Sequence, residues 1–563
     1  MSAKYFESQL ESFASKYIPD HEKNGLKYVL QPLTEIHFDE RYGNYLSESV
    51  SYQTLQSIAL IGLFLIITAI INFVNLSTAQ AITRSKEVGI RKVLGTSRWQ
   101  LIIQFMLETA IMTIAAMILG LGLTEMILLF FTDQIQFIGT PVLAFTWEIQ
   151  LFLIIITIFT SALAGIYPAI IVSGFSPLTA LKNSLFNKKP KGLGLRRSLV
   201  IVQFAIAQTL IFSTLIIVNQ IQHFHNKDLG FNKEAIIEFS IPNNDSTNLA
   251  LLRHNLIKHS NITNASFSLS TAINDSPTKS EITYDKLSDA PITVELKLGD
   301  ENFIASYGIQ LLAGRTNRRN DGLKSIVVNE TLLKKLHIND PHEALGENIN
   351  FLGMQSKIIG VVRDFHMSSL KQQITPCIIS SYSPLYFAGN VNIKLVDLQE
   401  TMEHVRREWL AIYPEHVFDY QFLDDKIAGL YQNEIRTSQL FVIFSSIAIF
   451  ISCIGLYGLV TFIAAQKTKE VGVRKVLGAN VFSIISLFSK EFMYLTFLGM
   501  LISSPFAYFI MSKWLEEFAY RIEIRPMLFV LVGLITLIIA GLTVGYKSYK
   551  TAIANPVKAL RNE

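Results

Sequence analysis

Seven long apolar runs constrain this chain more than any other feature of its sequence. Each run holds about 20 or more mostly apolar residues, enough for a helix to cross a hydrocarbon core about 30 Å thick. The expected limits are 57–77, 105–131, 149–172, 198–219, 440–464, 485–512 and 527–546. A composition that is 50% hydrophobic and 17% charged agrees with this pattern. We therefore expect a polytopic α-helical membrane protein with about seven spans.

Lys and Arg gather in four of the segments that separate or follow these spans, namely 84–98, 182–197, 467–475 and 547–561. Because basic residues accumulate on the cytoplasmic side, we expect these segments and the C-terminus to be cytoplasmic. The loop at 132–148, which has no Lys or Arg, is then external. Seven spans place the N-terminus outside as well. We therefore expect residues 1–50 to be the remnant of a first periplasmic domain that follows an upstream span.

The large polar insertion at 222–435 interrupts the series of apolar runs. It alternates runs typical of strands (325–329, 357–365, 390–396 and 417–423) with runs typical of helices (330–336 and 398–413). About 200 residues are enough to bury a hydrophobic core. The sequence thus predicts one large extracytoplasmic α/β domain.

A decapeptide occurs twice, as KEVGIRKVLG at 86–95 and KEVGVRKVLG at 469–478, an offset of 469 − 86 = 383 residues. The same offset aligns Glu108 with Glu491, and SPLTALKN at 176–183 resembles NPVKALRN at 555–562. The chain is therefore interpreted as two related units. The first permease unit spans 51–183, and the second spans 436–563. A basic linker (184–197) and a leading span (198–221) precede the large domain, whereas the first unit lacks its leading span.

Local signals predict a helix, a tight turn and a second helix at each copy. Glu stands four residues before Arg in both, the favourable order for an ion pair, but an exposed pair contributes only about 0.3–0.5 kcal/mol. Gly95 and Gly478 are expected at the helix C-termini. Ser97 with Gln100 resembles a capping box, and Asn480 is a good N-cap.

The repeated motif has two possible explanations. A basic anchor beside the membrane accounts for its Lys and Arg but not for the matched Glu, Gly and aliphatic residues. A docking surface for a cytoplasmic partner, used twice, accounts for all of them.

The two decapeptides resemble the cytoplasmic signature of the FtsX/MacB-like permeases of ABC transporters. The segments FIASYGIQLLAGR (303–315), VVNETLLKKL (327–336), IIGVVRDFH (358–366) and FAYRIEI (518–524) are similar to the same family. The resemblance implies a four-span unit with a large periplasmic domain between its first two spans. This chain resembles the variant that fuses two such units, with an N-terminally incomplete first unit.

The resemblance also implies a function. The chain would be the permease subunit of an ABC-type system in the bacterial inner membrane, with two copies of a separate cytoplasmic ATPase docked on the signature. ATP hydrolysis there would change the conformation of the periplasmic domain, by mechanotransmission, to export or extract a substrate. The implied ATPase-coupling residues are Glu87, Gly89, Arg91, Lys92 and Gly95, with Glu470, Gly472, Arg474, Lys475 and Gly478 in the second copy. Membrane lipid and a periplasmic adaptor or outer-membrane component are further compatible partners.

One alternative stays open at this point. Some members of this family do not transport, so the chain could be a transmembrane regulator or scaffold that relays the state of an ATPase to a periplasmic partner such as a cell-wall enzyme. A net charge of +4 is too small to indicate nucleic-acid binding.

The sequence carries no motif for chemistry of its own. GxxxxGK[ST], HExxH and CxxC are all absent, so we expect no enzyme activity, no bound cofactor or metal, and ATP hydrolysis in a partner subunit. Cys377 and Cys453 are expected to be free thiols. Asp364 and His366 lack a nucleophile beside them and are interpreted as a strand end. His223 and His225 are interpreted as an interfacial pair.

Overall fold

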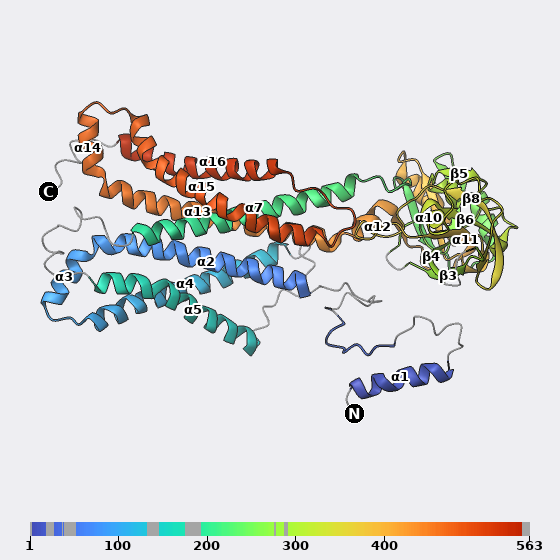
Figure 1. Ribbon diagram of the computed structural model, residues 1–563, viewed down its shortest axis with the longest axis horizontal. Helices are drawn as coiled ribbons and strands as arrows, with labels where there is room; N and C mark the ends of the chain where they lie inside the picture. Colours follow the sequence, from blue (N-terminus) through green and yellow to red (C-terminus); the bar gives the residue numbers. More distant parts are fainter. Residues whose placement is uncertain are drawn as a thin grey trace. The chain divides into compact units, whose positions relative to one another are not determined.

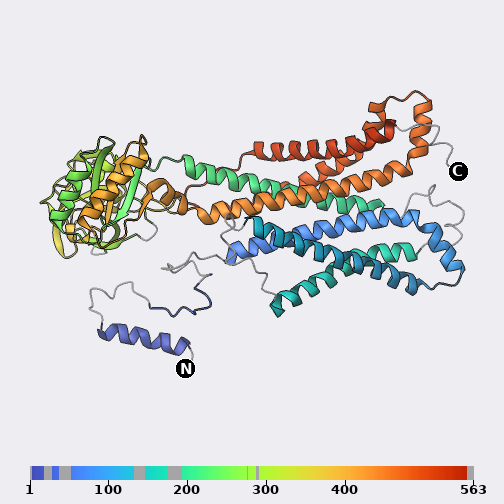
Figure 2. The same ribbon diagram turned by 180° about the vertical axis from the view of Figure 1, so that it is seen from behind.

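A computed structural model describes residues 3–17, 28–36, 38, 52–131, 146–174, 193–274, 277–286 and 291–553 (Figures 1 and 2). The chain divides into two compact units, each described here by itself. We call Ser57–Val218, Ser438–Trp514 and Glu523–Glu563 the bundle. We call Met1–Gln56, Asn219–Thr437 and Leu515–Ile522 the α/β domain. The short segment between the sixth and seventh spans therefore groups with the α/β domain.

The helices that build the bundle are α2 (Tyr52–Thr83), α3 (Ser85–Val93), α4 (Arg98–Phe131), α5 (Trp147–Ser173), α7 (Leu193–Asn226), α13 (Gln432–Gln466), α14 (Thr468–Val476), α15 (Val481–Leu515) and α16 (Pro526–Ile553). Within the described residues, seven of them are long and apolar enough to cross a membrane, which confirms the predicted number of spans. Several helices extend beyond the expected limits of their spans. Helix α7 begins at Leu193, so Arg196 and Arg197 lie in the helix and not in the linker predicted at 184–197, because a hydropathy count stops at the first charged residues whereas the helix does not.

Helix α7 is the central helix of the second half of the bundle, which comprises α7, α13, α15 and α16. Its Gln208 side chain donates to the Thr496 carbonyl (3.2 Å) and the Thr536 hydroxyl (3.1 Å), and accepts from Ser503 (3.2 Å). Gly499 of α15 lies against α7 so closely that an added Cβ would come within 3.0 Å of Phe204. As a result, 67% of the most apolar 18-residue stretch of α7 is buried, whereas the corresponding share for α4 is 11%.

Helices α2 and α13 run in the same direction. The Asn72 side chain donates to the Ile451 carbonyl (3.3 Å), and Leu76, one turn later, lies beside Gly458. The contacts thus advance together along both helices. The short helices α3 and α14, which follow α2 and α13, therefore begin at the same end of the bundle, as Figures 1 and 2 show.

Two sheets form the α/β domain. The antiparallel four-stranded sheet has the order β11 (Tyr420–Phe422), β1 (Ile236–Ser240), β10 (Ala388–Ile393) and β2 (Ile262–Ser268). The seven-stranded sheet has the order β5 (Leu311–Gly314), β8 (Met354–Val362), β6 (Ser325–Asn329), β9 (Cys377–Ser380), β4 (Ile292–Leu298), β3 (Lys279–Thr283) and β7 (Asn348–Phe351). Because β7 also pairs with β8, six of these strands close on themselves and leave β5 at the outside.

The helices of this domain are α8 (Ser246–Leu256), α9 (Phe303–Ser306), α10 (Glu330–Lys335), α11 (Leu398–Ile412) and α12 (Leu423–Gly429), with 3₁₀ turns at Gly322–Lys324 and Ser383–Leu385. Helices α8 and α11 pack together, and α8 lies on β2. One hydrophobic core, which includes Phe267, Phe351 and Trp409, joins both sheets. A separate α/β domain is thus confirmed.

Several predicted strands and helices lie close to the observed ones. β6 and α11 coincide with the expected strand at 325–329 and helix at 398–413 almost residue for residue. The strand expected at 390–396 is wrong at its end. β10 stops at Ile393, because the chain turns at Asp397, which has a φ of 47°. The strand expected at 417–423 shortens to β11 because α12 begins at Leu423.

Other expectations concern segments outside the described residues. They are the matched segments 176–183 and 555–562, most of the loop at 132–148, and most of the linker at 184–197. Of the segment 1–50, interpreted as a domain remnant, the structure describes helix α1 (Ala3–Tyr17) and residues 28–36 and 38.

Candidate functional site

The two copies of the decapeptide fold into the short helices α3 and α14, which we call the motif helices. In α3 the Glu87 carboxylate pairs with the Arg91 guanidinium at 2.6 Å, and in α14 Glu470 pairs with Arg474 at 2.8 Å. All four side chains are largely exposed, so these ion pairs add little stability. The predicted helix and its internal pair are confirmed in both copies.

Both motif helices end at a glycine that adopts a left-handed backbone. Gly95 has a φ of 97° and Gly478 a φ of 89°, a region that only glycine enters at low cost. The Gly95 amide donates to the Lys92 carbonyl, and the Gly478 amide donates to the Lys475 carbonyl, each at 3.1 Å. These bonds satisfy carbonyl groups that the helix end leaves open. The glycines therefore end the motif helices, as predicted.

The helices that follow start with the predicted side-chain caps. The Ser97 amide donates to the Gln100 side chain (2.8 Å), and the Gln100 amide donates to the Ser97 hydroxyl (3.3 Å), the two bonds of a capping box. In the second copy, the Asn480 side chain accepts from the Ser483 amide (2.8 Å). Each motif helix is thus joined to α4 or α15 by a short, hydrogen-bonded turn.

One valine in each motif helix fixes it to its own half of the bundle. Val88 is buried against Leu101 of α4 and Val172 of α5. Val471 occupies the equivalent position and belongs to a cluster with Ile484 of α15. Gly89 and Gly472, the next residues, are also buried. Both glycines, which belong to the expected ATPase-coupling residues, are therefore covered by the bundle in this structure.

A lysine ties each motif helix to the end of a membrane-spanning helix. The Lys92 ammonium donates to the Ser173 carbonyl at the end of α5 (2.6 Å), and Lys475 donates to the Ala552 carbonyl near the end of α16 (2.8 Å). A cation at a helix C-terminus is favourable because the last carbonyls lack helical partners. The two acceptors lie 552 − 173 = 379 residues apart, the offset already seen between the prolines of 176–183 and 555–562. These lysines therefore face inward and hold the bundle.

The outer face of each motif helix is apolar and exposed. Leu94 and Leu477 each expose 80% of their surface, which is unusual for leucine. Ile90 and Val93 are also exposed in the first motif helix, as are Val473 and Val476 in the second. Trp99 and Phe482, in the first turns of α4 and α15, are exposed as well. Exposed apolar residues in matched positions indicate a contact surface. The residues expected to couple to the ATPase do not include these aliphatic residues, although they recur in both copies of the decapeptide.

The matched glutamates Glu108 and Glu491 are bound differently. Glu108 pairs with Arg84 at 2.9 Å, just before the first motif helix. Glu491 pairs instead with Arg197 of α7 at 2.7 Å. The position repeats, but its ion-pair partner differs between the two halves.

Asp364 and His366 have structural contacts rather than a catalytic arrangement. The Asp364 carboxylate accepts from the amide and hydroxyl of Thr331, both at 2.8 Å. The buried His366 ring meets Tyr520 edge-on at 4.7 Å between ring centroids. Burial lowers the pKa of His366 to about 4, with the Lys227 charge acting in the same direction, while Asp228 and Asp364 oppose the shift. The imidazole is therefore neutral at pH 7 and packs as an aromatic ring.

The remaining candidate groups are the two cysteines and the histidine pair. Cys377 is buried and Cys453 is half-buried, and both are free thiols. His223 and His225 lie in the last turn of α7, and the described residues contain no group of three His, Cys, Asp or Glu side chains that could hold a metal ion.

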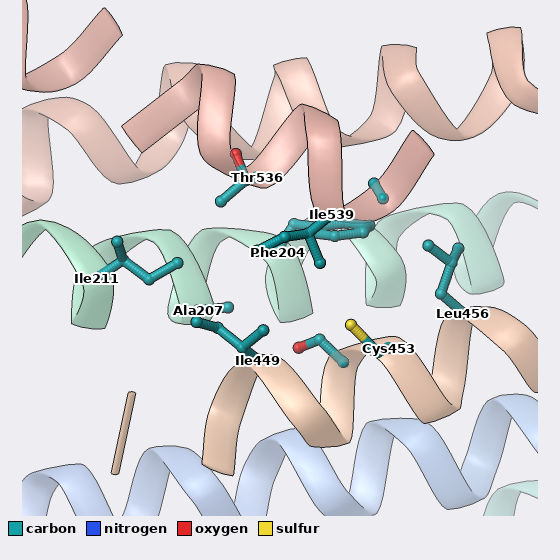
Figure 3. A pocket seen from close by; sticks show the side chains of 10 residues that line it. Phe204, Ala207, Ile211, Ile449, Cys453, Leu456, Thr536 and Ile539 are labelled. Atoms are coloured by element: carbon teal, nitrogen blue, oxygen red, sulfur yellow. The ribbon is translucent and has the colours of Figure 1, made fainter. Parts of the chain in front are cut away.

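A small cavity lies between α7, α13 and α16 (Figure 3). Its volume is about 20 Å³, and Phe204, Ile211, Cys453 and Ile539 are among its lining residues. Such a volume holds little more than one water molecule, with the hydroxyls of Ser452 and Thr536 among the lining groups. This cavity is therefore a packing gap and not a substrate site.

Comparison with known proteins identifies the two halves of the bundle. The family "FtsX-like permease C-terminal" matches residues 59–177 and 442–556. Each segment contains one motif helix and nearly all of the three spans around it. The internal repeat is thus a repeat of one permease domain.

Two curated relatives are the macrolide export ATP-binding/permease protein MacB of Escherichia coli and MacB 2 of Escherichia coli O1:K1 / APEC. Each is 24% identical over 212 residues, which cover 36% of this chain and 32% of the relative. The match therefore spans about a third of the length of these relatives.

Solved structures add two similarities. The periplasmic region of MacB from Actinobacillus actinomycetemcomitans is 16% identical and covers 36% of this chain and 95% of that one, with a TM-score of 0.27. The extracellular domain of the noncanonic ABC-type transporter YknZ from Gram-positive bacteria is 14% identical. The match covers 33% of this chain and 97% of that one, with a TM-score of 0.24.

Proposed function

This chain is an FtsX/MacB-like ABC permease with two FtsX-like permease domains in a multi-pass inner-membrane protein, and on that premise we propose that its two motif helices are docking sites for a separate cytoplasmic ATPase. The sequence contains no GxxxxGK[ST] motif, and the proposal therefore assigns ATP hydrolysis to a partner subunit. The C-terminus and both motif helices would face the cytoplasm.

The observation that carries this proposal is the matched apolar face of the motif helices. Leu94 and Leu477 expose the same 80% of their surface after helices of the same length and before equivalent turns. Covering apolar surface yields about 25 cal/mol for each Å² removed from water. A partner with a complementary groove would gain that energy twice, and Glu87, Arg91, Glu470 and Arg474 would supply polar contacts at its rim.

Two equivalent docking surfaces at one end of the bundle fit two copies of one ATPase. Because α2 and α13 run parallel, both motif helices leave the bundle at the same end. A pair of ATPase subunits that approach each other on binding ATP would then pull on both helices together. The chain needs no second copy of itself to offer two sites.

The inner contacts of the motif helices supply a route for movement. Val88 and Lys92 connect α3 to α4 and α5, and Val471 and Lys475 connect α14 to α15 and α16. A displacement of either motif helix is thereby passed to two spans. ATP can drive such a change only by favouring one of two packed arrangements of the bundle. We propose that this movement serves the export or extraction of a substrate.

A pull-down tests the docking surface. The affinity-tagged chain, solubilised from its native membranes, should retain an ABC ATPase that is quantified by mass spectrometry. Leu94→Asp combined with Leu477→Asp should lower the retained ATPase at least tenfold, because a carboxylate would be buried in the contact. Glu87→Ala combined with Glu470→Ala should lower it less.

Val417→Asp is the matched control, since Val417 of the α/β domain is an aliphatic residue that exposes 89% of its surface. It should leave the retained ATPase unchanged, and all variants should elute as monodisperse protein. Full retention of the ATPase by the double leucine variant would refute the docking proposal.

A further inference from the structure

A cleft of about 340 Å³ lies in the α/β domain where its two sheets meet. One wall is α8, which packs on the four-stranded sheet. The other side comprises the segment before β6 and the segment after β4, both from the seven-stranded sheet. Residues 381–386, which lead from one sheet to the other, complete it. Clefts of this size between structural layers are the usual place for small ligands.

Three charged side chains form the floor of the cleft: Asp300 is buried, whereas Arg253 and Glu301 are partly exposed. The Arg253 guanidinium pairs with the Asp300 carboxylate and with Glu301 (2.6 Å), and it lies over the Phe267 ring at 5.3 Å. Asp300 also accepts from the Phe267 amide (2.7 Å). Withdrawing Asp300 and most of Arg253 from water costs free energy before they pair, so this group of charges contributes little to stability alone. It is a good device for holding a charged group in a fixed position.

The floor leaves one acceptor open. Glu301 uses Oε1 for Arg253, and no bond from another described residue reaches its Oε2. Burial raises the pKa of Asp300 to about 6, against the opposing charge of Arg253, so this carboxylate is ionised above pH 7. Arg253, Asp300 and Glu301 then carry a net charge of −1.

The rim of the cleft offers a donor. Arg319 is exposed, and within the described residues its guanidinium makes one long hydrogen bond of 3.5 Å, to the Ser246 carbonyl. Most of its donors are therefore available to a ligand. With Arg319 included, the charges of the cleft sum to zero, which favours a ligand with no net charge over a simple cation or anion. Hydroxyls of Ser381 and Ser383 lie in the same cleft.

We propose that this cleft binds a small zwitterion, an amino acid or short peptide, with its ammonium group at Glu301 and its carboxylate at Arg319. A guanidinium binds a carboxylate through two parallel hydrogen bonds, and a carboxylate accepts well from an ammonium group. A volume of 340 Å³ lies at the lower end of the range for ligand pockets, which suits a dipeptide. This site is independent of ATPase docking, because its residues all lie in the α/β domain.

Titration calorimetry on the full chain in lipid nanodiscs at pH 7.5 tests the proposal with L-alanyl-L-alanine as the probe. The dipeptide should bind, and either an N-acetyl cap or a C-terminal amide should raise the Kd at least tenfold. Absence of binding at millimolar dipeptide would overturn the proposal. Equal binding of the doubly capped peptide would overturn it as well, since binding would then not depend on the charged ends of the dipeptide.

Variants locate the site. Arg319→Gln should raise the Kd for the dipeptide at least tenfold, whereas Arg318→Gln, a change at the neighbouring arginine that does not line the cleft, should leave it unchanged. Equal effects of both changes would contradict the assignment. Glu301→Gln also removes a partner of Arg253, so its melting temperature must be compared with that of the parent protein. The capped peptides, tested on the unaltered chain, keep the role of the ammonium group testable even where that variant is unstable.

Discussion

The first half of the bundle holds its motif helix on α4 and α5, and the second half holds its motif helix on α15 and α16 with α7 packed alongside. The contacts that fix the motif helices are the same in both halves, through Val88 and Lys92 in one and Val471 and Lys475 in the other. The matched glutamates, by contrast, have different partners: Glu108 pairs with Arg84, and Glu491 pairs with Arg197. In both halves the motif helix is therefore held by the two spans that follow it.

The two halves also differ in how their spans are packed. In the second half, Gln208 links α7 to α15 and α16 through three hydrogen bonds. In the first half, the positions that correspond to Thr496 and Ser503 are occupied by Thr113 and Gly120. Of the most apolar 18-residue stretch of α4, 11% is buried. A helix with so much uncovered apolar surface is stabilised mainly by its surroundings in the membrane. The second half should be the more stable one by itself.

The largest expected effect comes from removing the polar centre of the second half. Gln208→Leu should destabilise that half by about 2 kcal/mol, because each lost hydrogen bond inside a membrane protein is worth roughly 0.6 kcal/mol and the partners remain unpaired. Hydrogen exchange measured by mass spectrometry should then rise in α15 and α16 and stay constant in α4 and α5.

Gln104→Leu is the counterpart in the first half, where the Gln104 side chain bonds Arg91 (2.8 Å) and Glu108 (3.3 Å) at the surface. It should have a smaller effect. If Gln208→Leu raised exchange equally in both halves, the proposed difference between them would be wrong.

An intermediate effect is expected at the glycines that end the motif helices, and it should be equal in the two halves. Gly95→Ala and Gly478→Ala should each cost about 1 kcal/mol, because a side chain is strained at these φ angles although nothing lies within 4 Å of the added Cβ. Thermal unfolding in detergent measures the cost. Gly541→Ala, in open space inside α16, is the control and should not lower the midpoint. Unequal costs at the two motif glycines would show that their surroundings matter after all.

The smallest expected effect concerns the ion pairs of the matched glutamates, Glu108 and Glu491, which have different partners in the two halves. A double-mutant cycle of Glu491→Gln and Arg197→Gln should give a coupling of about 0.5 kcal/mol, typical of an exposed pair, and added salt should reduce it. The cycle of Glu108→Gln and Arg197→Gln should give none. A measurable coupling in that second cycle would mean that Arg197 serves both glutamates.

Local patterns were enough to predict much of this molecule. The apolar runs predicted the spans, Glu87 with Arg91 predicted a helical pair, and Gly95 with the Ser97–Gln100 box predicted the turn, since each signal acts over a few residues. The inward role of Lys92 could not be predicted, because its acceptor at Ser173 is fixed only when α3 and α5 meet. The closure of the seven-stranded sheet likewise depends on pairing between distant strands.

The number of ATPase subunits bound by one chain tests the central claim most directly. Native mass spectrometry of the complex purified from membranes should show two ATPase subunits for each chain. Leu94→Asp alone or Leu477→Asp alone should leave one subunit bound, because each motif helix would hold one. A single ATPase on the unaltered chain, or two on either single variant, would contradict the assignment of the motif helices as paired docking sites.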